Sequence, residues 1–418
     1  MNKKLTYISS GMSFTRIIFP EMKTDPEMIA WGNSVFKTMQ SNPNHDYGVL
    51  YNAWVEHRFG EVFKEHYKDN LAYIQADSGG LQIITQGKQI TPELKKQIYL
   101  NQGTYSDMAM AFDEIPLAFN DSRSGRLDLS NRWFDKENFE EKARQTGRNI
   151  FEQLKTFEEI GSGTLPIFIV QGNCYDTYMT WTEQALSEIP KDYHNRIGGI
   201  AMGAAALGHG TLEDIQRAFI FTQLPIEQKN HMHLLAVGAV ARMLPNMVFM
   251  QNGLYDGVHV TYDSTTHTSG VQMGNYYMNN GNYVFSRKFD RVKYGEIYRD
   301  VTSKFDIDVS LENFHEALNS KTMVYKERHG SRNGAIKSVM GACMSSITNF
   351  KNHIDECIDD KSKLLAFAEK YGKHGIFKTL YKVKTKDEFD YWLTHVGKYV
   401  TSKPVSSDKK QTLEEFFV

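Results

Sequence analysis

The chain has 418 residues, of which 41% are hydrophobic and 23% are charged, which is ordinary for a globular protein with a sizeable core. A formal net charge of -2 excludes a general attraction to nucleic acid, so any such contact must come from a local basic patch. No apolar run is long enough for a membrane span, and Cys174, Cys343 and Cys357 are too scattered for a disulfide framework. We therefore expect a cytoplasmic protein without membrane contact.

Short segments rich in β-forming residues recur along the chain and alternate with helical patterns. The predicted strands are residues 5–9, 47–52, 71–80, 108–114, 165–172, 197–203, 233–238 and 256–263. The predicted helices between them are residues 91–102, 138–160, 176–189 and 212–221. Thr91 and Pro92 stand where an N-cap and a first-turn proline belong. The alternation predicts a parallel sheet, and eight repeats favour a closed (β/α)8 TIM-type barrel over an open doubly wound sheet.

The pattern changes after residue 290. Residues 291–400 carry helical periodicities, for example in 342–358 and 361–372, and predict a C-terminal helical layer. Residues 401–410 are polar and predict a flexible linker. We therefore divide the chain into a barrel (1–290), a helical extension (291–400) and a flexible tail (401–418).

Polar residues and a glycine stand at several predicted strand ends, where barrel enzymes carry their active sites. They are Asp77, Asp113, Gln171, Gly199 and Asp263. Any one of them alone is explained by a helix cap or a turn, but together they converge on one pocket. Carboxylates, an amide and a glycine backbone suit a site that reads a purine base and carries a nucleophile.

The same segments resemble those of the tRNA-guanine transglycosylase superfamily in their sequence motifs and in the order of these motifs. The matching stretches are DSGGLQ (77–82), SDMAMAFDE (106–114), IFIVQG (167–172), GGIAMG (198–203), HLLAVG (233–238) and YDS (262–264). The resemblance implies a pentosyltransferase that exchanges one base for another. It implies that Asp263 is the nucleophile that attacks the ribose C1′, and that Asp77 shuttles protons for the leaving and incoming bases.

The resemblance also implies a base-reading set around these two catalytic residues. Asp113, Gln171 and the Gly199 backbone would bind the guanine edge, because a carboxylate accepts hydrogen bonds from the N1–H and amino groups. Further substrate contacts are expected from Ser78, Gly79, Ile200 and Leu235, the last two as apolar walls. The target nucleotide must leave its stack to reach such a pocket.

The chain departs from the tRNA enzymes at two motifs that concern zinc and tRNA. It has no C-x-C-x-x-C motif, and residues 347–349 lack the ligand histidine, so we expect no structural zinc and no cofactor. Residues 266–274 lack the arginines that grip the anticodon strand, which favours DNA over tRNA. His267 offers a partial substitute there, but a solvated loop histidine is the favoured interpretation.

Two further departures concern the bases. Ala204 stands where the bacterial enzymes have a glutamate, which favours an uncharged free base such as 7-cyano-7-deazaguanine over a cationic one. Leu81 stands where an aromatic ring often stacks on the base, so that stacking is lost or comes from elsewhere.

Basic residues interleave with aromatic residues in two places and are candidates for binding the nucleic-acid backbone. They are Arg287, Lys288, Arg291 and Lys293 in the first group and Arg328 and Arg332 in the second. A solvated charged face is an equally good interpretation of these groups.

The tail resembles the clamp-binding peptide of replication proteins. One helical turn would place Leu413, Phe416 and Phe417 on one side, able to enter a hydrophobic pocket of a sliding clamp. The alternative is that these residues pack back on the protein's own helices.

Within the superfamily, the chain is closest in character to the DNA-modifying 7-deazaguanine transglycosylases of phages and bacteria, and a phage-encoded protein would act in the host cytoplasm. The leading prediction is therefore a guanine transglycosylase that inserts a 7-deazaguanine base into DNA through a covalent aspartyl intermediate. The alternatives are a tRNA-guanine transglycosylase acting on tRNA, and a noncatalytic barrel subunit of a nucleic-acid-modifying complex. Retention of both Asp77 and Asp263 argues against the noncatalytic subunit.

Overall fold

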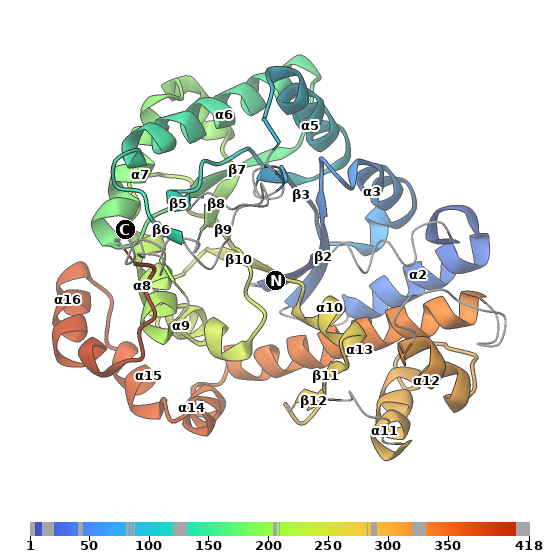
Figure 1. The fold of residues 1–418 in the computed structure, drawn as a ribbon. Coiled ribbons are helices and arrows are strands. Elements are labelled where there is room, and N and C mark those ends of the chain that lie inside the picture. Colours follow the sequence, from blue (N-terminus) through green and yellow to red (C-terminus); the bar gives the residue numbers. More distant parts are fainter. Residues whose placement is uncertain are drawn as a thin grey trace, which may run out of the picture.

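The computed structural model describes residues 5–10, 21–40, 45–80, 83, 86, 88–119, 132–203, 207–208, 210–281, 283–285, 291–319 and 332–406. Eight parallel strands close into a barrel, which confirms the predicted (β/α)8 architecture (Figure 1). Their order around the barrel is β1 (Leu5–Ser9), β10 (His259–Ser264), β9 (His231–Leu234), β8 (Gly199–Met202), β7 (Leu165–Val170), β4 (Met108–Met110), β3 (Ile74–Asp77) and β2 (His45–Asn52).

Helices follow the strands and cover the outside of the barrel (Figure 1). They are α2 (Pro26–Met39), α3 (His57–Val62), α5 (Pro92–Tyr105), α6 (Phe139–Glu159), α7 (Tyr175–Ser187), α8 (Thr211–Gln223), α9 (Val240–Gln251) and α10 (Thr266–Gln272). A π-helical turn (Phe63–Tyr67) and two 3-10 turns (Lys68–Asn70 and Lys191–Arg196) complete these connections, and a further 3-10 turn (Gly397–Tyr399) lies near the C-terminal end of the described residues. The four helices predicted between strands are confirmed as α5 to α8, and Thr91 caps α5 by accepting a hydrogen bond from the Leu94 amide.

Two features of the barrel segment do not follow from the strand–helix alternation. A hairpin of β5 (Leu117–Phe119) and β6 (Arg132–Phe134) is inserted between β4 and α6, and a second hairpin pairs β11 (Asn275–Tyr277) with β12 (Tyr283–Phe285). Both are short antiparallel pairs outside the barrel. Their three-residue strands stand outside the repeating strand–helix alternation, which made the equally short β4 recognisable.

The residues after the barrel form the predicted helical layer. It consists of α11 (Arg291–Thr302), α12 (Leu311–Asn319), α13 (Arg332–Ile358), α14 (Lys361–Lys370), α15 (His374–Leu380) and α16 (Lys386–His395). The long helix α13 contacts α2, α9 and α10 and runs along the outside of the barrel between α2 and α9 (Figure 1). Its buried residues include Ile347, Phe350 and Ile354, so the layer shares the core of the barrel helices.

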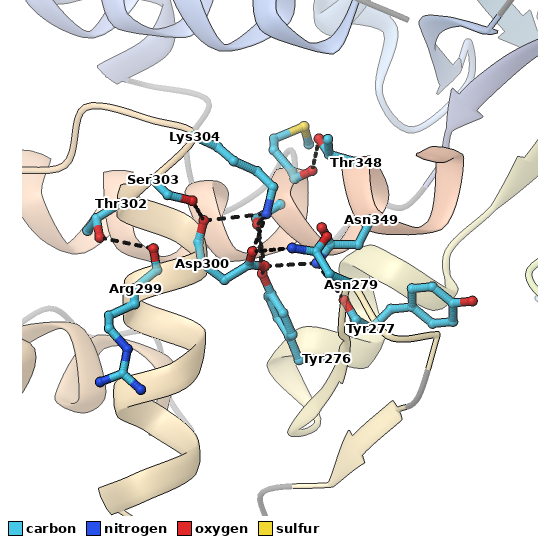
Figure 2. Close-up of polar contacts among 12 residues, drawn as sticks. Tyr276, Tyr277, Asn279, Arg299, Asp300, Thr302, Ser303, Lys304, Thr348 and Asn349 are labelled. Carbon is cyan, nitrogen blue, oxygen red and sulfur yellow. Dashed lines mark hydrogen bonds and ion pairs between the residues drawn. The ribbon is translucent and has the colours of Figure 1, made fainter. Parts of the chain in front are cut away.

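A polar cluster around Asp300 joins α11, α13 and the second hairpin (Figure 2). Its carboxylate lies 2.5 Å from Lys304 Nζ, and it accepts hydrogen bonds from the Tyr276 hydroxyl (2.5 Å) and from Asn349 Nδ2 (2.8 Å). Asn349 lies in the segment where the resemblance would put a zinc-ligating histidine. Asn349 instead donates hydrogen bonds to the Asp300 carboxylate and to the Tyr277 carbonyl (2.9 Å).

The segment after Tyr399 differs from the free linker that its composition predicts. The Thr401 carbonyl accepts from the Leu212 amide (3.1 Å), the Lys403 amide donates to Glu213 (3.1 Å), and the Ser406 carbonyl accepts from the Phe134 amide (2.8 Å). Residues 401–406 therefore lie along the barrel near the start of α8 and β6. The proposed clamp-binding residues Leu413, Phe416 and Phe417 lie outside the described residues. Among the described helices, none is long and apolar enough to cross a membrane.

Candidate active site

The carboxyl ends of the barrel strands form one rim, and a residue at or just after each strand end contributes to it. In the order of the barrel these are Ser10, Asp263, Ala236, Gly203, Gln171, Asp113, Asp77 and Asn52. Because the strands are parallel and the barrel is closed, their carboxyl ends face the same side. Asp77, Asp113, Gln171 and Asp263 therefore lie at the end of the barrel where the sequence predicts them.

Gly199 is not at this rim, and that part of the prediction is wrong. It is the first residue of β8 and pairs with Ile167 in the interior of β7, whereas β8 ends at Met202. Gly203 follows at the rim, where an added Cβ would lie 2.1 Å from Gln171 Oε1. The glycine that meets the predicted base-reading amide is therefore Gly203.

The two predicted apolar walls have different positions. Ala201 belongs to a cluster formed only by residues on or beside the strands, with Met108, Ile167 and others, and this cluster fills the inside of the barrel. Successive side chains of a strand point to opposite faces, so Ile200 points outward, where it is fully buried in the core shared with the helices. Ile200 therefore does not line the rim. Leu235 packs against the inner cluster and remains a candidate wall.

Asp263 is surrounded by hydrogen-bond donors. Its Oδ2 accepts from the Ser10 hydroxyl (2.8 Å), and its Oδ1 accepts from the Ala236 amide (2.9 Å). His233 Nε2 lies 3.6 Å from Oδ1, longer than an ordinary hydrogen bond. Burial by itself would raise the pKa of Asp263, but His233, the Ala236 amide and Ser10 outweigh it and hold the pKa below its ordinary value. This carboxyl group is therefore ionised at neutral pH.

The Ala236 amide reaches Asp263 through an unusual backbone conformation. Ala236 has a φ of 58°, and no other non-glycine residue that the structure describes has a positive φ. Its carbonyl accepts a hydrogen bond from Arg242 Nη1 (2.7 Å), and Arg242 Nη2 is paired with Asp214 at 3.0 Å. A strained residue held by its surroundings is typical of functional sites.

Asp77 and Asp113 have the opposite electrostatics. Burial, followed by repulsion from Asp113 and from Asp263, raises the pKa of Asp77 to about 7. Burial also raises the pKa of Asp113 to about 6, although Gln171 Nε2 donates to its Oδ2 at 2.8 Å. Near neutrality Asp77 is therefore able both to give and to take a proton.

The loop after β3 lies against the end of β2. Gly79 has a φ of 76°, and an added Cβ would lie 2.5 Å from Asn52 Oδ1. Ser78 is buried, and its hydroxyl accepts a hydrogen bond from the Gly80 amide at 3.3 Å. Both predicted contact residues therefore shape the backbone beside Asp77.

Besides His233 Nε2, two buried polar atoms at the rim have no partner within the described residues: Gln171 Oε1 and Asn52 Nδ2. Buried polar groups are normally hydrogen-bonded, and an unpaired one calls for a specific explanation such as a ligand. One atom is an acceptor and the other a donor, so the rim is prepared for a partner that carries both kinds of group.

The sequence did not single out four residues of the rim. Ser10 and Asn52 follow or end predicted strands and are recoverable by the strand-end rule. His233 and Ala236 lie inside the matched HLLAVG stretch, but no sequence signal shows that a histidine faces the barrel interior or that an alanine adopts a positive φ.

The loop prediction around His267 is also wrong. Residues 266–272 form α10, and His267 is 1% exposed, with its ring centroid 4.2 Å from that of Phe350. Burial lowers the pKa of His267 to about 3. It is therefore a neutral core histidine, neither solvated nor available to a phosphate.

The predicted basic groups are described only in part. Lys293 is exposed on α11, and Arg332, at the start of α13, is 62% exposed in its side chain and pairs with Glu21. The side chain of Arg291, and Arg287, Lys288 and Arg328 altogether, lie outside what the structure describes, as do Leu81 and Ala204.

Within the described residues, no group of three or more His, Cys, Asp or Glu side chains is arranged to hold a metal ion. Comparison of the chain with protein-family models gives no match, and comparison with curated proteins gives no significant match.

Proposed function

We propose that this protein is a guanine transglycosylase that exchanges guanine in DNA for a 7-deazaguanine base, with 7-cyano-7-deazaguanine as the incoming base. The observation that carries the proposal is the contrast between two carboxyl groups on one rim. Asp263 is held ionised by donors, and Asp77 has a pKa raised to about 7. Base exchange needs a permanently ionised nucleophile and a separate group that exchanges protons near neutral pH.

In the first half of the reaction, an Asp263 oxygen attacks the C1′ of the target nucleotide and forms an ester bond. The C1′–N9 bond breaks, and guanine leaves with the bonding electron pair. Protonated Asp77 supplies the proton that the leaving base needs, and becomes a carboxylate. Its raised pKa supports this role, because a large fraction of Asp77 is protonated near pH 7.

In the second half, the incoming base binds where guanine was. The Asp77 carboxylate takes the proton from N9–H, and N9 attacks C1′. The ester bond to Asp263 breaks, and the released carboxylate again accepts hydrogen bonds from Ser10 and the Ala236 amide. Asp77 and Asp263 finish in their starting states, so neither a cofactor nor another reactant is required.

Recognition of the base is assigned to Asp113 and Gln171. A carboxylate at Asp113 accepts from the N1–H and amino groups that distinguish guanine from adenine. Gln171 contributes an amide whose Oε1 has no partner among the described residues, next to Gly203. Leu235 would supply an apolar surface for the ring.

The preference for DNA rests on residues 266–274, which contain no arginine to grip an RNA strand. In the structure residues 266–272 form α10, and its His267 is buried, so that histidine gives no phosphate contact. The exposed Lys293 remains a candidate for the nucleic-acid backbone.

The test measures exchange on both nucleic acids. The protein is incubated with free 7-cyano-7-deazaguanine and with either DNA or tRNA that contains isotopically labelled guanine. Released guanine and the modified nucleosides are measured by mass spectrometry, with Asp263→Ala as the inactive control. Exchange on DNA supports the proposal, and exchange on tRNA alone replaces it by the tRNA enzyme. Absence of exchange on both overturns it in favour of a noncatalytic barrel.

A further inference from the structure

The inside of the barrel contains three histidines on two neighbouring strands. His231 and His233 alternate along β9 and face inward, and His259 faces inward from β10. The His231 and His259 rings have centroids 5.3 Å apart. His259 bonds to Thr6 Oγ1 at 2.9 Å and to the Tyr73 hydroxyl at 3.3 Å, on the amino-terminal side of the interior. Only His233 lies next to the rim.

One hydroxyl group joins the two histidines of β9. Thr261 Oγ1 lies 3.0 Å from His231 Nε2 and 2.8 Å from His233 Nδ1. The other ring nitrogen of His233, Nε2, is completely buried and has no hydrogen-bond partner within the described residues. It points at Asp263, with Oδ1 at 3.6 Å.

The position of the protons follows from this arrangement. Where Thr261 donates to His233 Nδ1, a neutral His233 carries its proton on Nε2, facing Asp263. Where Thr261 donates to His231 or to the Met232 carbonyl (3.5 Å) instead, His233 Nδ1 must carry a proton. A bare Nε2 lone pair would then face the Asp263 carboxylate, unless Nε2 is protonated as well. In each case, a hydrogen on His233 Nε2 is the arrangement that suits an ionised Asp263.

We propose that His233 is a positioning residue that orients and stabilises the Asp263 carboxylate from inside the barrel. The proposal rests on the function proposed above and adds a residue to it. A charged oxygen accepts a hydrogen bond more strongly than an ester oxygen does, so the Nε2 proton favours the free carboxylate over the covalent intermediate. His233 therefore assists the second half of the reaction, in which Asp263 is the leaving group.

The test compares two substitutions in the same interior. His233→Phe keeps a flat ring but removes the donor, and His259→Phe makes the same change at a histidine that does not contact Asp263. The covalent adduct is formed on guanine-containing DNA without incoming base, and its decay is followed after addition of 7-cyano-7-deazaguanine. We expect His233→Phe to slow this decay about 10–100-fold and to accumulate more adduct than the wild type, since the ring N–H that faces the Asp263 carboxylate is removed. His259→Phe should resolve its adduct at the wild-type rate.

A purely structural loss would lower the amount of adduct rather than increase it. His233→Gln, whose Nε2 offers a donor near the same place, should restore most of the decay rate. Equal decay rates for His233→Phe and His259→Phe would overturn the inference while leaving the proposed function intact.

A second measurement does not depend on activity. The pKa of the Asp263 carboxyl group is followed by carbon-13 NMR, with its signal identified by its absence in Asp263→Asn. Loss of the donor should raise this pKa in His233→Phe but not in His259→Phe. If the wild type forms no adduct on any nucleic acid, the proposed function fails, and this titration alone decides the role of His233. An unchanged pKa in His233→Phe would reject that role.

Discussion

The two sides of the barrel rim carry aspartates whose pKa values are shifted in opposite directions. Asp263 faces the Ser10 hydroxyl, the Ala236 amide and His233, and its pKa is lowered. On the other side burial raises the pKa of Asp77 to about 7, and repulsion from Asp113 adds to it. Burial acts on both sides in the same direction. The difference therefore comes from the groups that each carboxylate faces: the donors around Asp263 outweigh burial, whereas the Gly79 and Ser78 amides at Asp77 do not outweigh burial and the repulsion from Asp113.

The donors around Asp263 depend on distant parts of the chain. Ser10 comes from the end of β1, and Ala236 holds its amide in place with a φ of 58°. By contrast, Asp77 ends β3 and Asp113 follows β4, and these two strands pair with each other and also follow each other in the sequence, whereas Ser10 lies 253 residues from Asp263. The ionised state of Asp263 therefore depends on donors that follow two different strands, one of them at the start of the chain.

Asp263→Asn should have the largest effect, because it removes the nucleophile and keeps the side-chain shape. We expect base exchange to fall by at least about 10⁴-fold and the covalent adduct to disappear. Asp46→Asn, at the opposite end of the barrel on β2, is the matched control and should exchange normally. Exchange by Asp263→Asn at a rate near that of the control would contradict the nucleophile assignment.

Asp77→Asn should slow exchange by about 10²–10³-fold, since a general acid–base group is lost. The same change should stabilise the protein at high pH. The folded-state pKa of about 7 lies above the unfolded value. Asp77 therefore lowers the free energy of unfolding progressively as the pH rises from the unfolded pKa to the folded pKa, and the whole loss is present above the folded pKa. At pH 8 we expect a gain of about 1–3 kcal/mol, and at pH 4 almost none. Thermal unfolding at both pH values measures this, and a lower Tm at pH 8 would show that Asp77 is not a buried, repelled carboxylate.

Asp113→Asn should reduce kcat/KM for guanine-containing DNA by about 10–100-fold, because an amide presents a donor to the N1–H of guanine. It should also lower the pKa of Asp77, since the neighbouring negative charge is removed. The pH profile of exchange should therefore shift to lower pH. Glu114→Gln, the next residue along, serves as the control. An unshifted pH profile in Asp113→Asn would show that the charge of Asp113 does not affect the pKa of Asp77.

Ala236→Gly should have the smallest effect, and this effect is a gain in stability rather than a loss of exchange activity. Glycine adopts a positive φ without steric strain, so we expect the free energy of unfolding to rise by about 1 kcal/mol. Ala241 lies inside helix α9, and Ala241→Gly should lower stability by about 0.5–1 kcal/mol. Urea unfolding distinguishes the two. A loss of stability in Ala236→Gly would mean that Ala236 carries no strain.

Much of the fold can be predicted from local patterns. The eight β-rich segments and the helices between them were recognisable because each barrel repeat has its own hydrophobic run and its own caps, such as Thr91 before α5. The strand-end rule placed Asp77, Asp113, Gln171 and Asp263 on one rim for the same reason. The inserted hairpin of β5 and β6 was not predicted, because its short strands stand outside the repeating strand–helix pattern.

The sequence by itself determined the closed barrel and the residue types available at its carboxyl end. The tertiary structure decided which residues face the rim. In a strand buried on both faces, hydrophobic residues occupy every position, so the pattern does not tell inside from outside. For this reason Ile200 was expected in the pocket but points outward, and Gly203 rather than Gly199 lies at the end of β8. Protonation was decided in the same way, because the pKa of a carboxyl group depends on burial and on neighbours that only folding brings together.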